Sequence, residues 1–195
     1  KKTAKKTVKK AVKKSTKKAA KKASPKKVTK KAAPKAAKVG DSKVKVGAHV
    51  PNFQIHATGG KTISLESLKG KKVVLYFYPK DATPGCTIEG HDFTKLYPEF
   101  EKENTEVFGI SRDDLNSHEK FKSKEGYCFD LLSDESGELS ETFGVWQEKN
   151  NYGKKYMGIV RSTFLIDEDG VLQKEWRSVK VDGHAQEVLN TVKED

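Results

Sequence analysis

Apolar residues gather into short runs separated by turn residues. Residues 73–78 and 106–111 are almost continuously apolar, which is typical of strands buried on both faces. Residues 52–56 and 61–65 alternate between polar and apolar positions, as half-buried strands do. The same reasoning predicts further strands at residues 129–132, 158–167 and 171–176.

Helical periodicity appears between these strands. Phe93, Leu96 and Phe100 share one helix face, so residues 87–103 are predicted to form a core-facing helix that Pro98 bends. Other helices are expected at residues 65–68 (a single turn), 117–125, 137–143 and 184–193, with an irregular loop at residues 146–155.

The predicted order is strand, helix, strand, helix, strand, then a hairpin that turns at residues 167–170 and a closing helix. The first two central strands are expected to be parallel because a helix connects them, whereas the hairpin is antiparallel. This is an α/β chain with a mixed central sheet flanked by helices, the thioredoxin-like arrangement. No Cys-x-x-Cys is present, which excludes the dithiol chemistry of thioredoxin itself.

Cys86 lies where the first central strand passes into its helix, in the stretch YPKDATPGCT at residues 78–87. A helix N-terminus offers unpaired N–H groups and a partial positive charge, which favour the thiolate, the nucleophilic form of cysteine. Thr83 places a hydroxyl three residues before the sulfur. Cys86 is therefore the candidate nucleophile, and an inert buried cysteine is the alternative.

Charge divides the chain into two parts. Residues 1–38 hold 18 of the 39 basic side chains and no acidic one, which leaves 21 basic and 27 acidic side chains in the rest. Residues 1–38 are too poor in apolar side chains to fold alone. We expect a disordered tail at residues 1–38, a linker at residues 39–45 and one domain at residues 46–195.

The tail is predicted to bind DNA. Lysine pairs recur every four residues, and each lysine that neutralises a phosphate releases counterions, which gives salt-dependent affinity without sequence preference. The tail also resembles the basic tails of linker histones, including Ser24-Pro25-Lys26-Lys27. A solubilising tail, or one that binds RNA or acidic membranes, is the alternative. The lysines assigned to nucleic acid are Lys5, Lys6, Lys9, Lys10, Lys13, Lys14, Lys17, Lys18, Lys21, Lys22, Lys26 and Lys27.

Two cysteines, Cys86 and Cys128, are too few for a disulfide scaffold, which fits a reducing compartment. No apolar run reaches the roughly 20 residues of a membrane span, and the first residues do not form a secretory signal. We expect a cytoplasmic protein associated with the nucleoid, or a nuclear one if the source is eukaryotic, with no membrane partner.

The pattern Pro79-x-x-x-Thr83-x-x-Cys86 resembles the active-site motif of peroxiredoxins. Further segments, in matching order, resemble the bacterioferritin comigratory protein (PrxQ) subfamily, and the resemblance runs from about Val46 to the C-terminus. These segments are residues 50–53, 131–134, 143–146, 152–159 and 161–167.

The resemblance implies reduction of hydrogen peroxide and organic hydroperoxides by a peroxidatic Cys86, without metal, haem or nucleotide. Thr83 would hydrogen-bond the sulfur and the peroxide, Arg161 would stabilise the thiolate and the developing charge, and Pro79 would screen the sulfur from water. Glu89, one turn after Cys86, either orients Arg161 or only favours the helix N-terminus. The alternatives are structural: Thr83 as a helix cap, Arg161 as a surface charge and Pro79 as a strand terminator.

The chain departs from the subfamily at the resolving cysteine, because His91 stands five residues after Cys86 where many members carry that cysteine. His91 is expected to face solvent. Cys128, flanked by Tyr127 and Phe129, is expected at a core or strand-entry position, with a resolving role as the alternative. We therefore expect thioredoxin, glutaredoxin or glutathione to attack the oxidised Cys86 directly, in a monomer or weak dimer.

Two functions follow from these observations. The first is a thiol peroxidase that the basic tail tethers to DNA. The second is a DNA-compacting or redox-sensing nucleoid protein whose peroxiredoxin domain does not turn over.

Overall fold

The structure, a computed structural model, describes residues 42–151 and 153–194. The predicted tail, all of its lysines and most of the predicted linker lie outside the described residues. Within the described end of that linker, Val44 is buried in the core and Lys43 N donates to Thr142 O at 2.9 Å. The packed part of the chain therefore extends into the segment predicted as linker.

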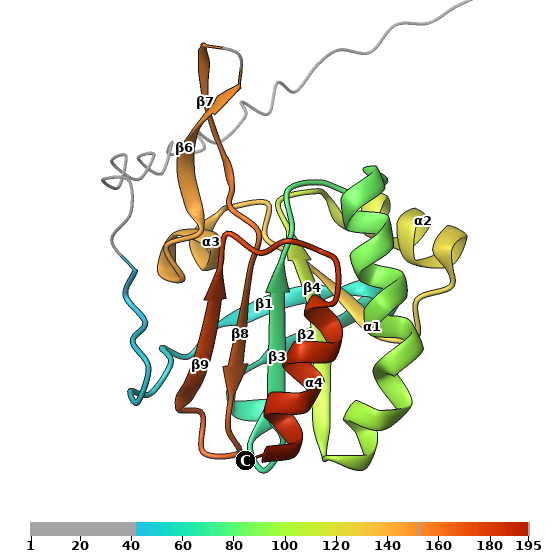
Figure 1. The fold of residues 1–195 in the computed structure, drawn as a ribbon, viewed down its shortest axis with the longest axis vertical. Helices are drawn as coiled ribbons and strands as arrows, with labels where there is room; N and C mark the ends of the chain where they lie inside the picture. Colours follow the sequence, from blue (N-terminus) through green and yellow to red (C-terminus); the bar gives the residue numbers. More distant parts are fainter. Residues whose placement is uncertain (1–41, 152, 195) are drawn as a thin grey trace, which may run out of the picture. The chain divides into compact units, whose positions relative to one another are not determined.

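A seven-stranded sheet lies at the centre of the folded part, in the order β2-β1-β5-β4-β3-β8-β9 (Figure 1). The pairs β3–β4 and β4–β5 are parallel, whereas β8 runs antiparallel to both β3 and β9. The mixed sheet predicted from the sequence is thus confirmed. Its strands are β1 (Gln54–Ala57), β2 (Lys61–Ser64), β3 (Lys72–Phe77), β4 (Thr105–Ser111), β5 (Asp130–Ser133), β8 (Ser162–Ile166) and β9 (Leu172–Arg177).

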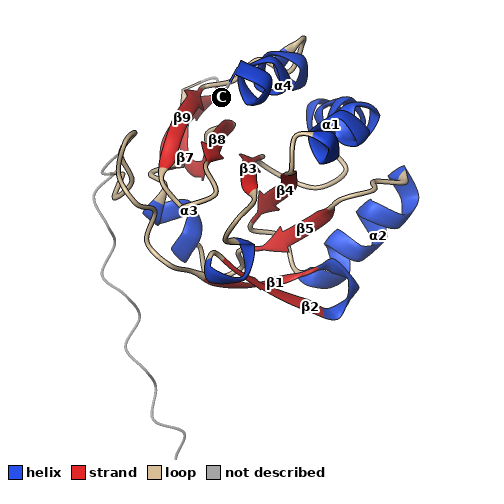
Figure 2. Ribbon diagram, turned by 90° about the horizontal axis from the view of Figure 1, so that it is seen from below, coloured by secondary structure: helices blue, strands red, loops and turns tan. Residues whose placement is uncertain are grey.

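Helices cover both faces of this sheet. The helices α1 (Pro84–Lys102), α2 (Leu115–Glu125) and α4 (His184–Glu194) pack on one face, and the short α3 (Glu138–Thr142) lies on the other (Figure 2). Two single 3-10 turns, η1 (Thr58–Gly60) and η2 (Glu66–Leu68), flank β2. Side chains of β3 alternate between the two cores, Tyr76 toward α1 and Leu75 and Phe77 toward α3, so residues 73–77 are all apolar.

Helix α1 begins at Pro84, three residues before the predicted start. Thr83 is extended (φ −93°, ψ 148°), and the fixed φ of proline suits the first helical position. The helix continues through Pro98 to Lys102, because the packing of Phe93 and Phe100 outweighs the cost of an internal proline. Cys86 is consequently the third residue of the helix rather than the residue before it.

The expectation of an irregular loop at residues 146–155 is wrong. These residues belong to a two-stranded hairpin, β6 (Trp146–Asn151) and β7 (Lys154–Ile159), which projects beyond the sheet (Figure 1). The single strand expected at residues 158–167 is correspondingly divided, with Val160 and Arg161 between β7 and β8. Most of β7 is exposed, so neither face of the hairpin carries the apolar alternation by which a strand is recognised.

Among the described residues, no helix is both long enough and apolar enough to span a membrane.

Candidate active site

Cys86 lies at the start of α1, beyond the carboxyl end of β3, and only 2% of its surface is exposed. The first helical hydrogen bond runs from Thr87 N to Thr83 O at 2.9 Å, which leaves the N–H groups of Gly85 and Cys86 in the unpaired first turn. Unpaired N–H groups at a helix start attract an anion. The sulfur is therefore sheltered from water and lies at the positive end of a helix.

Arg161 reaches this sulfur from the short link between β7 and β8. Its Nη2 donates to Cys86 Sγ at 3.3 Å, and its Nη1 forms an ion pair with Glu89 Oε2. A Cβ atom on Gly85 would lie 3.4 Å from Nη2, so a glycine at this position lets the guanidinium lie close against the helix. The structure thus brings together Cys86 and Arg161, which are 75 residues apart in the chain.

Glu89 is the acidic group of the site. Its side chain is 1% exposed, and Oε1 has no hydrogen-bond partner among the described residues. Burial raises the pKa of Glu89 to about 7, although the charge of Arg161 acts in the opposite direction. Burial acts to lower the pKa of Arg161, but the charges of Glu89 and Cys86 outweigh it and the pKa is raised. Glu89 was expected either to orient Arg161 or only to favour the helix N-terminus. Its contact with Arg161 Nη1 fits the first of these roles.

Thr83 and Pro79 flank the site on the loop between β3 and α1. Thr83 is the N-cap residue of α1, but its side chain makes no capping hydrogen bond; Oγ1 donates to Lys80 O at 3.1 Å. With its proton committed to Lys80, the hydroxyl keeps lone pairs that can accept. Pro79 directly follows the buried Tyr78 and is itself exposed.

Lys149 on β6 is a cation near the site that sequence reasoning missed. Its Nζ donates to Ile159 O at 2.8 Å, two residues before Arg161. Burial lowers the pKa of Lys149, the positive charge of Arg161 lowers it further, and Cys86 has the opposite effect. Since the segment was expected to be a loop, no sequence signal directed Lys149 toward Cys86.

Cys128 is exposed and lies two residues before β5, so of the two expected positions the core one is wrong and the one at the strand entry holds. Tyr127 and Phe129 on either side of it are buried, in a bent segment between α2 and β5. The Cys128 thiol contacts Thr94 O at 3.8 Å, a carbonyl that lacks its helical donor because Pro98 has no N–H. Burial of part of the side chain raises the pKa of Cys128.

His91 is exposed on α1, as expected from its position. Its Nε2 lies 3.1 Å from Glu125 Oε2 on α2, and its ring packs edge-on against Tyr127. The position five residues after Cys86 is therefore occupied by a side chain that joins α1 to α2.

A sheltered cysteine at a helix start, with a guanidinium on its sulfur, is arranged for nucleophilic attack that leaves negative charge beside it. On a thioredoxin-like fold without a second cysteine in the motif, this site defines the class of thiol-dependent peroxidases.

Comparisons with known proteins agree with this class. Residues 46–175 match the family model described as AhpC/TSA family. The chain is 47% identical to peroxiredoxin Bcp of Bacillus subtilis (strain 168) over 151 residues, which cover 77% of this chain and 96% of that protein. It is 40% identical to peroxiredoxin Bcp of Escherichia coli (strain K12), over 77% of this chain and 97% of that protein.

Solved structures are similar over the same region. The bacterioferritin comigratory protein of Xanthomonas campestris, described in a trapped intermediate and ligand complex, has a TM-score of 0.72 and 44% identity, over 79% of this chain and 98% of that one. A mutant PrxQ of Xylella fastidiosa has a TM-score of 0.75 and 41% identity over the same shares. The chain belongs to the AhpC/TSA family and, within it, to the Bcp or PrxQ peroxiredoxins, and it is a thiol-dependent peroxidase.

Proposed function

We propose that Cys86 is the peroxidatic residue of this enzyme. Its thiolate attacks the terminal oxygen of a hydroperoxide, an S–O bond forms, the O–O bond breaks, and the leaving oxygen takes up a proton to become water or an alcohol. Cys86 is thereby oxidised to a sulfenic acid while the peroxide is reduced. The observation that carries this proposal is the contact of Arg161 Nη2 with Cys86 Sγ at 3.3 Å.

Arg161 stabilises the charge that moves during this reaction. Negative charge passes from the sulfur to the leaving oxygen, and a guanidinium fixed next to the sulfur is close to both. Its second nitrogen is engaged by Glu89, which keeps the group from turning away. The N–H groups at the start of α1 add to the same anion site.

Thr83 is proposed to orient the peroxide, and Pro79 to screen the sulfur from water. Because Thr83 Oγ1 donates to Lys80 O, its lone pairs can accept a hydrogen bond from the O–H of the hydroperoxide and hold the reacting oxygen toward Cys86. Pro79 lies between the end of β3 and this loop, where a rigid apolar ring would limit water on the open side of the site.

An external thiol is proposed to complete the cycle. Cys128 contacts Thr94, and helix geometry places residue 94 about 12 Å along α1 from Cys86, whereas a disulfide needs Cα atoms within about 7 Å. A bridge to Cys128 would require the first turns of α1 to unwind. The thiol of a thioredoxin, a glutaredoxin or glutathione instead attacks the sulfenic acid, releasing water, and a further thiol reduces the mixed disulfide.

The proposed substrates are hydrogen peroxide and organic hydroperoxides. The description of the related Xanthomonas campestris structure refers to alkyl peroxide reduction by that protein. A site in which one cysteine does the chemistry accepts either kind, since only the terminal O–O group reacts.

Replacing the nucleophile tests this proposal. Cys86→Ser is expected to abolish peroxide consumption in the presence of dithiothreitol, because an alcohol does not ionise at neutral pH. Cys128→Ser is the matched control and is expected to keep the wild-type rate. Turnover by Cys86→Ser, or loss of turnover in Cys128→Ser alone, would show that the nucleophile has been misassigned.

We further propose that residues 1–38 tether the enzyme to DNA. The support is compositional: 18 lysines, no acidic residue, and a remainder of opposite net charge. Deleting residues 1–38 is expected to leave peroxidase activity unchanged and to remove retention on duplex DNA. If about ten lysines engage phosphates, the affinity of the full chain falls with salt at a log–log slope of roughly −9. Equal DNA retention by the truncated chain would refute the tether.

A further inference from the structure

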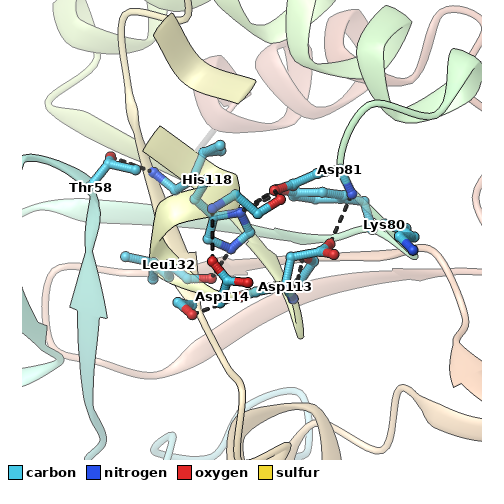
Figure 3. Close-up of polar contacts among 12 residues, drawn as sticks. Thr58, Lys80, Asp81, Asp113, Asp114, His118 and Leu132 are labelled. Carbon is cyan, nitrogen blue, oxygen red and sulfur yellow. Dashed lines mark hydrogen bonds and ion pairs between the residues drawn. The ribbon is translucent and has the colours of Figure 1, made fainter. Parts of the chain in front are cut away.

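Asp81, on the loop between β3 and α1, takes part in a buried polar cluster with His118 (Figure 3). Asp81 on this loop is 7% exposed, and His118 on α2 is fully buried. Buried charged groups are costly unless they are paired and hydrogen-bonded. No hydrogen bond joins Asp81 or His118 to Cys86 or Arg161, so direct contact with the reacting groups does not account for this cluster.

Two hydroxyl groups donate hydrogen bonds to the Asp81 carboxyl group. Tyr78 Oη donates to Oδ1 and Ser117 Oγ to Oδ2, both at 2.7 Å. The backbone N of Asp81 donates in turn to Asp113 Oδ2 at 2.9 Å. Burial acts to raise the pKa of Asp81, but its bonds from His118, Tyr78 and Ser117 outweigh it and the pKa is lowered. The carboxyl group is therefore ionised.

His118 connects this carboxylate to the central sheet. Its Nδ1 lies 3.0 and 2.9 Å from the two oxygens of Asp81, and its Nε2 lies 3.1 Å from Leu132 O on β5 (Figure 3). The ring therefore has a hydrogen-bond acceptor facing each of its nitrogens. Asp81 and His118 form a buried pair that links the loop to α2 and β5.

The backbone next to Asp81 is strained. Ala82 has a φ of +55°, the left-handed region in which the Cβ atom crowds the following carbonyl. Such a conformation persists only where the surroundings hold it in place. Ala82 is itself exposed, so the fixed Asp81 on one side and the start of α1 on the other are what hold it.

We propose that Asp81 and His118 are positioning residues for the peroxidase reaction. The buried pair holds residues 81–83 in the strained form that aims the Thr83 hydroxyl and the start of α1 at the peroxide. This inference rests on the proposed role of Cys86. Neither side chain touches the substrate; both act through the backbone of the loop.

The test compares two reactions of the same sulfur in the full chain. Reaction with hydrogen peroxide needs Thr83 and Arg161 in place, whereas alkylation by iodoacetamide needs only an accessible thiolate. Asp81→Asn is expected to lower the second-order rate constant with peroxide by about 10- to 100-fold, the scale of a misplaced reacting group, and the alkylation rate by much less. The ratio of the two rates therefore falls.

Asp130→Asn is the matched control. Asp130 on β5 is also a partly buried carboxylate, bound by Lys61, Lys122 and Thr58, but it does not contact the Cys86 loop. The Asp130→Asn variant is expected to be less stable to urea but to have the same ratio of peroxide to alkylation rates as the wild type. The ratio thus separates positioning from a general loss of stability.

Ala82→Gly supplies a second test, since glycine adopts positive φ without strain. It is expected to restore part of the peroxide rate in the Asp81→Asn background and to change the wild-type rate little. If Asp81→Asn does not fold, Ser117→Ala, which removes a single bond to the carboxylate, is expected to lower the ratio by a smaller factor.

An unchanged ratio in the folded Asp81 or Ser117 variant, or no recovery on adding Ala82→Gly, would overturn the inference. The wild-type chain distinguishes this failure from that of the proposed function. If wild-type Cys86 reacts with peroxide no faster than a free thiol, the peroxidatic role fails; if it reacts fast and so does Asp81→Asn, only the positioning role fails.

Discussion

Arg161 is shared between two anionic partners, and this sharing governs the charge at the sulfur. Nη1 faces the Glu89 carboxyl and Nη2 faces Cys86 Sγ. When Glu89 is ionised, its negative charge offsets part of the positive charge that Arg161 presents to the sulfur. When Glu89 is protonated, the whole charge is available to the thiolate and to the leaving oxygen.

Glu89 should make stability depend on pH in an unusual direction. Its pKa in the folded chain is about 7, above the ordinary value of 4.5, so between these values the folded state binds more protons than the unfolded state. The free energy of unfolding therefore falls as pH rises from 4.5 to 7. The shift is equivalent to roughly 3 kcal/mol at 1.36 kcal/mol per pKa unit.

Urea unfolding of the wild-type chain and Glu89→Gln, at about pH 5 and pH 8, measures this effect. The stability of wild type relative to Glu89→Gln is expected to fall by up to about 3 kcal/mol between the two values, because glutamine does not titrate. Glu148→Gln, an exposed change on β6, is the control and should track wild type. A difference that is constant with pH, or that grows as pH rises, would contradict the assigned direction.

Single residues differed in how well the sequence indicated them. Cys86 was indicated by its place between a buried strand and a helix, and Arg161 only by a family motif, since its link between two strands has no periodicity. Asp81 and His118 carried no signal, because a buried pair formed across 37 residues leaves no local pattern. Cys128 was expected at a core or strand-entry position because its neighbours Tyr127 and Phe129 are apolar; these neighbours are buried, but Cys128 itself is exposed.

At the scale of elements, the first turns of α1 are fixed by a close contact rather than by helix propensity. Gly90 lies on the helix under the ring of Tyr127, whose Oη also donates to Thr87 O at 3.3 Å. A Cβ atom on Gly90 would lie 2.4 Å from Tyr127 Cζ. Glycine in a helix interior is ordinarily unfavourable, so its presence here reflects the space that Tyr127 needs.

The effect of Gly90→Ala on the free energy of unfolding is therefore expected to have the opposite sign from usual. In an open helix this change raises stability by about 1 kcal/mol, but here the displaced ring should cost about 1–3 kcal/mol. Urea unfolding checks the direction. In a Tyr127→Ala background, where the space is vacant, the same change is expected to become neutral or stabilising. If Gly90→Ala instead increased stability in the wild-type background, the Tyr127 ring would be shown to move aside without destabilising the fold.

The elements of the central sheet were predictable, and the hairpin was not. Strands β3, β4 and β5 are buried by helices on their faces, and this burial requires the apolar runs that reveal them. Most of β7 is exposed and none of residues 146–150 of β6 is buried, so these strands depend on mutual pairing and leave no apolar pattern. Lys149 went unnoticed for that reason.

At the scale of the whole molecule, the chain joins a catalytic domain of net negative charge to a lysine-rich segment. The composition of residues 1–38 indicates a polyanion as partner but does not distinguish DNA from RNA. The domain's sequence indicated both fold and reaction class, because the order of strands and helices and the family motifs agree. What it could not give is how the loop holding Thr83 is kept in place, which depends on contacts between distant residues.

The most direct test of the central claim is a single turnover with hydrogen peroxide. The fully reduced chain is mixed with one equivalent of peroxide, quenched at increasing times and analysed by mass after proteolysis. We expect a reaction much faster than that of a free thiol, with one oxygen added to the peptide of Cys86, Cys128 still reduced and no bridge between them. A rate equal to that of a free thiol, or oxidation that begins at Cys128, would contradict the account.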